Sequence, residues 1–149
     1  MRTLIDLFDE CDRHLQALGE AMHRCPQPLT ENHFTPRNPD LIATLDQFAY
    51  RFAKLQDAMS TQLFRRFCVQ ILQEPVETRP VIDILNLLER YDYLSSAKRW
   101  QEIREIRNQI SHEYQLSTPE LIVTLQMAFV MVAEMADVVA VLKNTAQSG

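Results

Sequence analysis

Residues 121–142 read LIVTLQMAFVMVAEMADVVAVL, the longest apolar stretch of the chain. The stretch is long enough to cross a bilayer, but Glu134 and Asp137 lie in its interior, where charged side chains are costly in lipid. On a helix, these two residues and Gln126 form a narrow polar stripe, and the rest of the circumference is apolar. We therefore expect a helix that is buried on several sides. It is either the central helix of the fold or a helix whose surplus apolar face meets a second copy of the protein.

The composition of the whole chain fits a bundle of such helices. The 149 residues suffice for one ordinary domain with a core, and 46% of them are hydrophobic. Only Gly19 and Gly149 are glycine. Because glycine supplies the positive φ angles of tight turns, its scarcity disfavours β-hairpins, β-sandwiches, dinucleotide-binding turns and phosphate-cradling loops together. The composition predicts an all-α fold in a single domain over residues 1–149.

Apolar periodicity and capping residues place five helices in this domain, with the long ones antiparallel. Asn38 is a predicted N-cap, Ser95 or Ser96 is another, and Ser117 with Glu120 has the spacing of a capping box. Prolines punctuate an unusually long connection over residues 25–39. The sequence predicts helices from Leu4 to before Cys25, from Pro39 to near Gln73, from Pro80 through Tyr91, from Lys98 towards Tyr114 and from Ser117 onward, with a disordered or frayed tail at about 144–149.

Charge and cysteine content indicate the setting in which the protein works. The formal net charge is −5, which argues against nucleic-acid binding driven by the field of the whole chain. Any such contact needs a local basic surface. Cys11, Cys25 and Cys68 are an odd number without metal-ligand spacing, and an amphipathic pattern begins at the N-terminus with no leader-like segment before it. We expect a cytoplasmic protein with reduced thiols.

The familiar enzyme signatures are missing from the sequence. There is no GxGxxG, P-loop, HExxH, GxSxG or CxxC pattern, so we expect no cofactor and no metal site. His14, His23 and His33 are scattered, and we interpret each as an ordinary surface histidine. The candidate chemistry therefore rests on the one remaining histidine and its neighbours.

That histidine is His112, in the stretch REIRNQISHEY over residues 104–114. On a helix, Ile106 and Ile110 face the core, whereas His112 points roughly the other way with Asn108 four residues before it. Histidine can exchange a proton near neutral pH, and a nearby arginine can bind a phosphate oxygen. Such a pair can cleave RNA without a metal, because histidine takes the proton of a 2′-hydroxyl while arginine stabilises charge growing on the phosphate.

The spacing of Arg107 and His112 complicates this interpretation. Five positions on an ideal helix correspond to roughly 140° around the axis, so the two side chains do not share a face. Three arrangements could still bring them together. The arginine side chain could curl around the helix, the helix could distort, or a second subunit could complete the site.

A family resemblance adds to this reading. The pattern Arg107-Asn108-x-x-x-His112-x-Tyr114 resembles the Arg-x4-His-x-Tyr motif of the HEPN superfamily, in particular of the HepT-like toxins encoded beside a minimal nucleotidyltransferase antitoxin. Residues 100–106, with Trp100 at their start, resemble the approach to that motif. Residues 51–57, RFAKLQD, resemble another recurrent segment of the family. With the five-helix order, the resemblance covers nearly the whole chain.

The resemblance implies an all-helical homodimer whose motifs line a shared cleft and act as a metal-independent endoribonuclease on RNA. It implies that Arg107 and His112 are the catalytic pair and that Asn108 orients the histidine. It also implies a cognate minimal nucleotidyltransferase that silences the toxin by transferring AMP to Tyr114. The sequence leaves open a second possibility, in which Tyr114 is a half-buried tyrosine packed near Ile110.

Basic residues beside the core face could bind the RNA backbone. Arg51 and Lys54 lie close together around the axis of the second helix, and Arg104 adds charge on the fourth, so we expect these three to contact phosphates. The alternative is a solvated basic stripe. We interpret Asp57 as a structural partner of a nearby arginine or lysine, because no second carboxylate is placed to make it a general acid.

Two other functions remain open from the sequence. The same arginine, histidine and tyrosine could bind a nucleotide without cleaving anything, in a non-catalytic HEPN-like subunit of a nucleotidyltransferase complex. The chain could also be a helical adaptor whose last helix mediates assembly.

Overall fold

Side-chain caps start the helices where the sequence predicts them. The Asn38 side chain accepts a hydrogen bond from the backbone N–H three residues on, and Ser96 does the same. Ser117 and Glu120 form the expected capping box, in which each side chain accepts a hydrogen bond from the backbone N–H of the other. These predicted caps are confirmed, and each satisfies a backbone donor that has no partner within the first helical turn.

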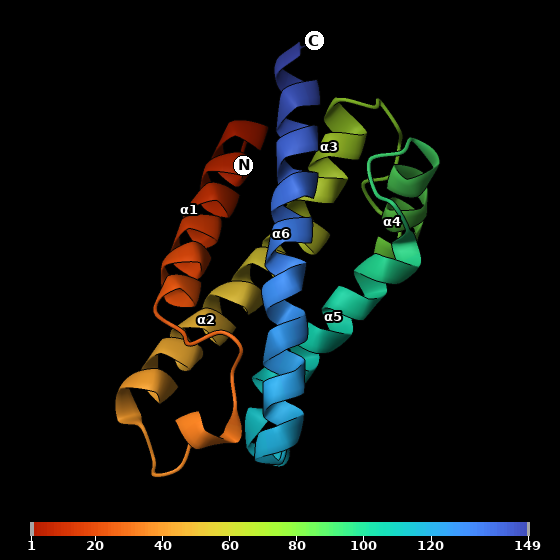
Figure 1. Ribbon diagram of the computed structural model, residues 1–149. Helices are drawn as coiled ribbons and strands as arrows, with labels where there is room; N and C mark the ends of the chain where they lie inside the picture. The colour runs from red at the N-terminus through yellow and green to blue at the C-terminus, as the bar shows by residue number, and fades with distance from the viewer. Residues whose placement is uncertain (1, 149) are drawn as a thin grey trace.

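The computed structural model describes residues 2–148, apart from the side chain of Tyr114, and every regular element among these residues is helical. The elements are α1 (Leu4–His23), a 3-10 turn (Glu31–His33), α2 (Pro39–Ala58), a π-helical segment (Met59–Leu63), α3 (Phe64–Gln70), α4 (Val81–Arg90), α5 (Ala97–Ser111), a second 3-10 turn (Glu113–Gln115) and α6 (Thr118–Ser148). Since α2, the π-helical segment and α3 follow one another without a break, residues 2–148 form five continuous helical segments. Figure 1 shows their arrangement. The all-α prediction is confirmed.

Helix α6 runs along the molecule between α1 and α5 (Figure 1). It is antiparallel to α5. Thr124 near the start of α6 lies beside Gln109 near the end of α5, and Glu134 farther along α6 binds Arg99 near the start of α5. The start of α6 and the end of α5 therefore lie at the same end of the bundle.

The core is built around aromatic side chains of α2 and α3. Phe48, Phe52, Phe64 and Phe67 are fully buried. The Phe48 ring meets Phe129 of α6 edge to face, with the ring centroids 4.9 Å apart, an arrangement that aromatic pairs prefer. Apolar residues from all the α-helices join these rings in one cluster, so a single core holds the bundle together.

Helix α6 buries one face and leaves another open. Its exposed large apolar side chains fall on one narrow arc of the helix, which we call the α6 apolar stripe; they are Val123, Met127, Val130 and Val141. Within residues 2–148, α6 is the one helix long and apolar enough to cross a membrane, and 44% of the relevant window is buried in the protein. Glu134 and Asp137 lie on the same arc, so the open face is mixed, and its contact with a second copy stays a prediction.

Three features differ from the sequence prediction. The long second rod ends at Gln70 rather than near Gln73, and its π-helical segment was not anticipated. Residues 144–148, expected to be a frayed tail, continue α6 as a helix, and Lys143 just before them forms an ion pair with Asp12 of α1. Gly149 lies outside the described residues. The proline-rich connection is partly packed, because Leu29 is buried and its carbonyl accepts a hydrogen bond from Gln126 of α6.

Candidate functional site

The guanidinium of Arg107 is held by two side chains. Its Nε and Nη2 donate to the Asp57 carboxylate at 3.0 and 2.8 Å, and its Nη1 donates to the Ser111 hydroxyl at 2.7 Å. Ser111 in turn donates to the Arg107 carbonyl. Hydrogen bonding to Asp57 raises the pKa of Arg107, so the guanidinium stays charged. The predicted role of Asp57 as a structural partner of a basic residue is confirmed.

Arg107 lines a surface hollow of about 360 Å³ between α2 and the end of α5, which we call the Arg107 hollow. On the α2 side, one helical edge supplies polar residues at spacings of three and four; the edge consists of Asp46, Tyr50, Lys54 and Asp57. On the α5 side, Ser111 and Glu113 close the hollow. Acidic groups and cations therefore face the same space.

His112 lies at the other side of the helix end. It is the C-cap residue of α5, it is exposed, and it lines a separate shallow hollow together with Asn108 and Gln109. Helix α5 is regular through Ser111 and Arg107 points towards Asp57, so neither helix distortion nor a curled arginine joins the pair. Within one chain, Arg107 and His112 are not brought together.

The three expected phosphate-binding residues have separate surroundings. Lys54 lines the Arg107 hollow. Arg51 instead turns towards α1, where its Nη1 donates to the Nδ1 atom of His14 at 3.0 Å. Arg104 donates to the side chain of Gln101 at 3.3 Å, one turn back along α5. Of the three, Lys54 is the one that the structure places beside Arg107.

The interpretation of His14 as a surface histidine is wrong. Its ring is buried, with 7% of the residue exposed, and it lies between Glu10 of its own helix and Arg51 of α2. Since Arg51 donates to Nδ1, the other ring nitrogen carries the proton and donates to Glu10, which also binds Arg2. His14 therefore forms a polar contact across the α1–α2 interface. The spacing of residues along α1 cannot reveal this contact, because the partner Arg51 lies on another helix.

Two carboxyl groups meet at one end of the Arg107 hollow. Burial raises the pKa of Glu113, and the negative charge of Asp46 and a hydrogen bond between the two groups raise it further. Sequence reasoning missed both residues, and also Tyr50 and Ser111. The four-residue spacing of Asp46, Tyr50 and Lys54 was the available signal, because it places all three on one edge of a helix.

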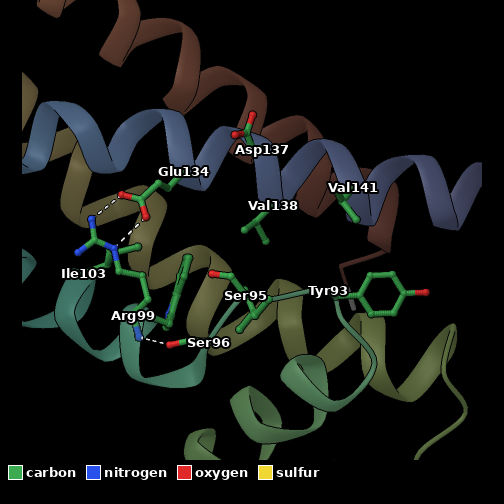
Figure 2. Close-up of a pocket in the computed structure, with 11 residues that line it drawn as sticks. Tyr93, Ser95, Ser96, Arg99, Ile103, Glu134, Asp137, Val138 and Val141 are labelled. Atoms are coloured by element: carbon green, nitrogen blue, oxygen red, sulfur yellow. Dashed lines mark hydrogen bonds and ion pairs between the residues drawn. The ribbon is translucent and has the colours of Figure 1, made fainter.

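The side chain of Tyr114, the expected modification site, lies outside the described part of the structure. A second, more apolar hollow of about 260 Å³ lies between α5 and α6, where Arg99 makes a two-pronged ion pair with Glu134 (Figure 2). It contains none of the residues predicted to be catalytic, to bind phosphate or to be modified. Among the described residues, no group of three or more His, Cys, Asp or Glu side chains is placed to hold a metal ion.

Comparisons of this chain with protein-family models, with curated proteins and with solved structures found no match.

Proposed function

We propose that this protein is a cytoplasmic, toxin-type endoribonuclease that cleaves RNA without a metal, using Arg107 and His112 in a cleft completed by a second copy of the chain. The observation that carries the proposal is the setting of Arg107. Its guanidinium is fixed by Asp57 and Ser111 at the edge of a hollow and lies near Lys54. A cation oriented in advance can stabilise charge that develops on a phosphate without a reorganisation step.

In this reaction, His112 takes the proton from the 2′-hydroxyl of the RNA, and the 2′-oxygen attacks the adjacent phosphorus. The bond to the 5′-oxygen of the next nucleotide breaks, and that oxygen leaves with a proton from a second acid. Arg107 stabilises the negative charge on the phosphate oxygens. The products are a 2′,3′-cyclic phosphate and a 5′-hydroxyl. A two-fold dimer would supply the second acid as the same histidine of the other copy.

The α6 apolar stripe supports assembly with a second copy. Val123, Met127 and Val130 lie in the first half of α6, which runs beside the end of α5. Three large apolar side chains that are 44 to 62% exposed on one helix face are typical of an interaction surface. A two-fold dimer buries the same face of both copies, and the cleft of this proposal requires that Arg107 of one copy come close to His112 of the other.

Control by a nucleotidyltransferase belongs to the same proposal. Transfer of AMP from ATP to the Tyr114 hydroxyl, with release of pyrophosphate, would add bulk and negative charge two residues beyond His112. Both changes oppose the binding of RNA phosphates near Arg107. After coexpression with an active cognate enzyme, we expect mass spectrometry to find AMP increments on Tyr114, and an unmodified Tyr114 would contradict this part of the proposal.

The catalytic part is tested by incubating purified protein with total RNA in EDTA. Wild type should cleave, whereas His112→Ala and Arg107→Ala should not. His23→Ala is the matched control, because His23 is an exposed histidine at the end of another helix. Val130→Glu should give a monomer in sedimentation and lose cleavage while it keeps its helical circular dichroism. Equal cleavage by all variants would remove Arg107 and His112 from the mechanism.

One observation favours a second candidate function. Arg107 lines a hollow of nucleotide size that does not include His112, as expected for a subunit that binds a nucleotide without cleaving RNA. The two functions predict different results in cells. Growth arrest on expression that His112→Ala relieves would support the ribonuclease, whereas a harmless wild-type protein that still binds nucleotides would support the binding subunit.

A further inference from the structure

We propose that Tyr50 is a stacking platform for a nucleobase and that the Arg107 hollow holds one nucleotide of a single-stranded RNA, with its base towards Asp46 and Glu113 and its phosphate towards Lys54 and Arg107. This inference rests on the proposed function, because it assigns a subsite to the RNA of that reaction. It adds the contact with a base, which Arg107 and His112 alone do not provide.

The ring of Tyr50 is exposed at the surface. Two tyrosines are among the exposed large apolar residues. Tyr50 is 58% exposed and Tyr91 is 44% exposed. Tyr91 donates a hydrogen bond to Glu74 and its ring stacks on Tyr93, so it has partners within the fold. Tyr50 lines the Arg107 hollow, and the side chains over its ring are those of Arg51 and Lys54. Aromatic rings at such places stack on bases of any type, because every base has a π face.

Cations adjoin the Tyr50 ring. The Lys54 Nζ lies 5.5 Å from the ring centroid, and the Arg51 Cζ lies 5.8 Å from it. Arg51 is also bound by His14, so it is fixed beside the ring, whereas Lys54 is exposed and has a flexible stem. An aromatic side chain next to a mobile cation is the combination that single-stranded nucleic acids require, with the ring under the base and the ammonium on the phosphate.

Charge along α2 sets the direction of the nucleotide. Asp46 lies one turn before Tyr50 near Glu113, whereas Lys54 lies one turn after Tyr50 near Arg107, whose guanidinium binds Asp57. A phosphate is repelled by Asp46 and Glu113 and attracted to Lys54, while Asp57 partly offsets the charge of Arg107. The base edge therefore faces the carboxyl groups, which accept hydrogen bonds from ring N–H and amino groups. Guanine presents adjacent donors of this kind, whereas uracil presents mainly carbonyl oxygens, so we expect guanine to bind more tightly than uracil.

The size of the hollow agrees with a single nucleotide. Its volume of about 360 Å³ lies at the low end of the roughly 300–1,000 Å³ found for small-molecule sites. The walls are the α2 edge and the end of α5, so the platform and the phosphate cations are carried by helices rather than by loops. Functional groups on helices are positioned more accurately than groups on loops.

The test is direct binding of GMP and UMP, measured by isothermal titration calorimetry with the full chain. Tyr50→Ala should weaken GMP binding by about 5- to 150-fold, the range for loss of one base stack, and Tyr50→Phe should bind like wild type. Tyr91→Ala is the matched control and should also bind like wild type. Asp46→Asn should reduce the preference for GMP over UMP, and Lys54→Ala should weaken both nucleotides alike.

Wild-type affinity in Tyr50→Ala, equal losses in the Tyr50 and Tyr91 variants, or no measurable GMP binding by wild type would each overturn the inference. Its failure can be distinguished from failure of the proposed function, because nucleotide binding is measured without cleavage. If wild type binds GMP through Tyr50 but cleaves no RNA, the platform stands and the ribonuclease falls. If cleavage depends on His112 while Tyr50→Ala binds and cleaves like wild type, only the platform falls.

Discussion

Replacement of Ser60 by alanine is expected to destabilise the protein strongly, although it removes a single oxygen atom. Ser60 lies in the π-helical segment, where its hydroxyl accepts hydrogen bonds from the Trp100 indole N–H, at 2.7 Å, and from the Gln56 amide. All three residues are at most 3% exposed. Alanine leaves both donors in the core without an acceptor. At about 1–3 kcal/mol for each of the two unsatisfied groups, we expect a loss of about 2–6 kcal/mol in the free energy of unfolding.

Urea unfolding provides the measurement. Trp100 is the only tryptophan of the chain, so its fluorescence reports on this part of the core, and far-ultraviolet circular dichroism reports on the helices as a whole. Ser95→Ala is the matched control, because Ser95 is an exposed serine shortly before α5, the helix that carries Trp100. It should change the free energy of unfolding by no more than about 0.5 kcal/mol. The slope of the free energy of unfolding against urea concentration should be the same for all variants if their unfolded states are alike.

A double-mutant cycle separates the hydrogen bond from other effects of the substitution. Trp100→Phe removes one of the two donors, so Ser60→Ala should cost about 1 kcal/mol less in that background than in wild type. Ser60→Ala within about 0.5 kcal/mol of wild type, or additive effects in the cycle, would refute the argument that these buried donors depend on Ser60.

Three further outcomes are expected. Arg99 lowers the pKa of Glu134 by hydrogen bonding. The stability that this pair contributes is therefore present above the ordinary glutamate pKa and is lost as the pH falls through the lowered pKa. The free energies of unfolding of Glu134→Gln and wild type, measured in urea, should differ at pH 7 and converge in acid. Burial raises the pKa of Cys11 and Cys68 to about 12, so a chromogenic disulfide reagent should react with these thiols only after unfolding, and rapid labelling of the native protein would contradict their burial. Asn38→Ala should cost about 1 kcal/mol through loss of the cap on α2, whereas Asn38→Asp should retain the stability, as measured by thermal unfolding.

The sequence predicts the helices well because their signals are local. A cap such as Asn38 and its backbone partner lie within four residues, and an apolar face repeats every turn. The π-helical segment also has a local signal in the sequence. Leu55, Met59, Leu63 and Phe67 repeat every four residues, a spacing that drifts by about 40° per step on an ideal α-helix. A wider π turn removes this drift, and all four side chains are fully buried.

The site was predicted less completely because its contacts cross between helices. The spacing of Arg107 and His112 correctly indicates that they diverge, and the expectation of a basic partner for Asp57 is confirmed. Which basic residue Asp57 meets, however, depends on how α5 crosses α2, fifty residues apart in the chain. The same crossing assembles Tyr50 and Glu113 in one hollow. The sequence of each helix shows which side chains lie on one of its faces. Which faces of two helices meet depends on how the helices pack.

In the proposed function, pairing of the cations would limit how strongly one chain binds RNA. Arg51 is bound by His14, Arg104 by Gln101 and Arg107 by Asp57, and the basic side chains that line the Arg107 hollow are Lys54 and Arg107. With two phosphate contacts per chain, the logarithm of affinity should fall with the logarithm of salt concentration with a slope of only about −1.4. Much of the affinity must then come from contacts that salt does not screen. In a chain with a net charge of −5, stacking on an exposed aromatic ring is the interaction that meets this requirement.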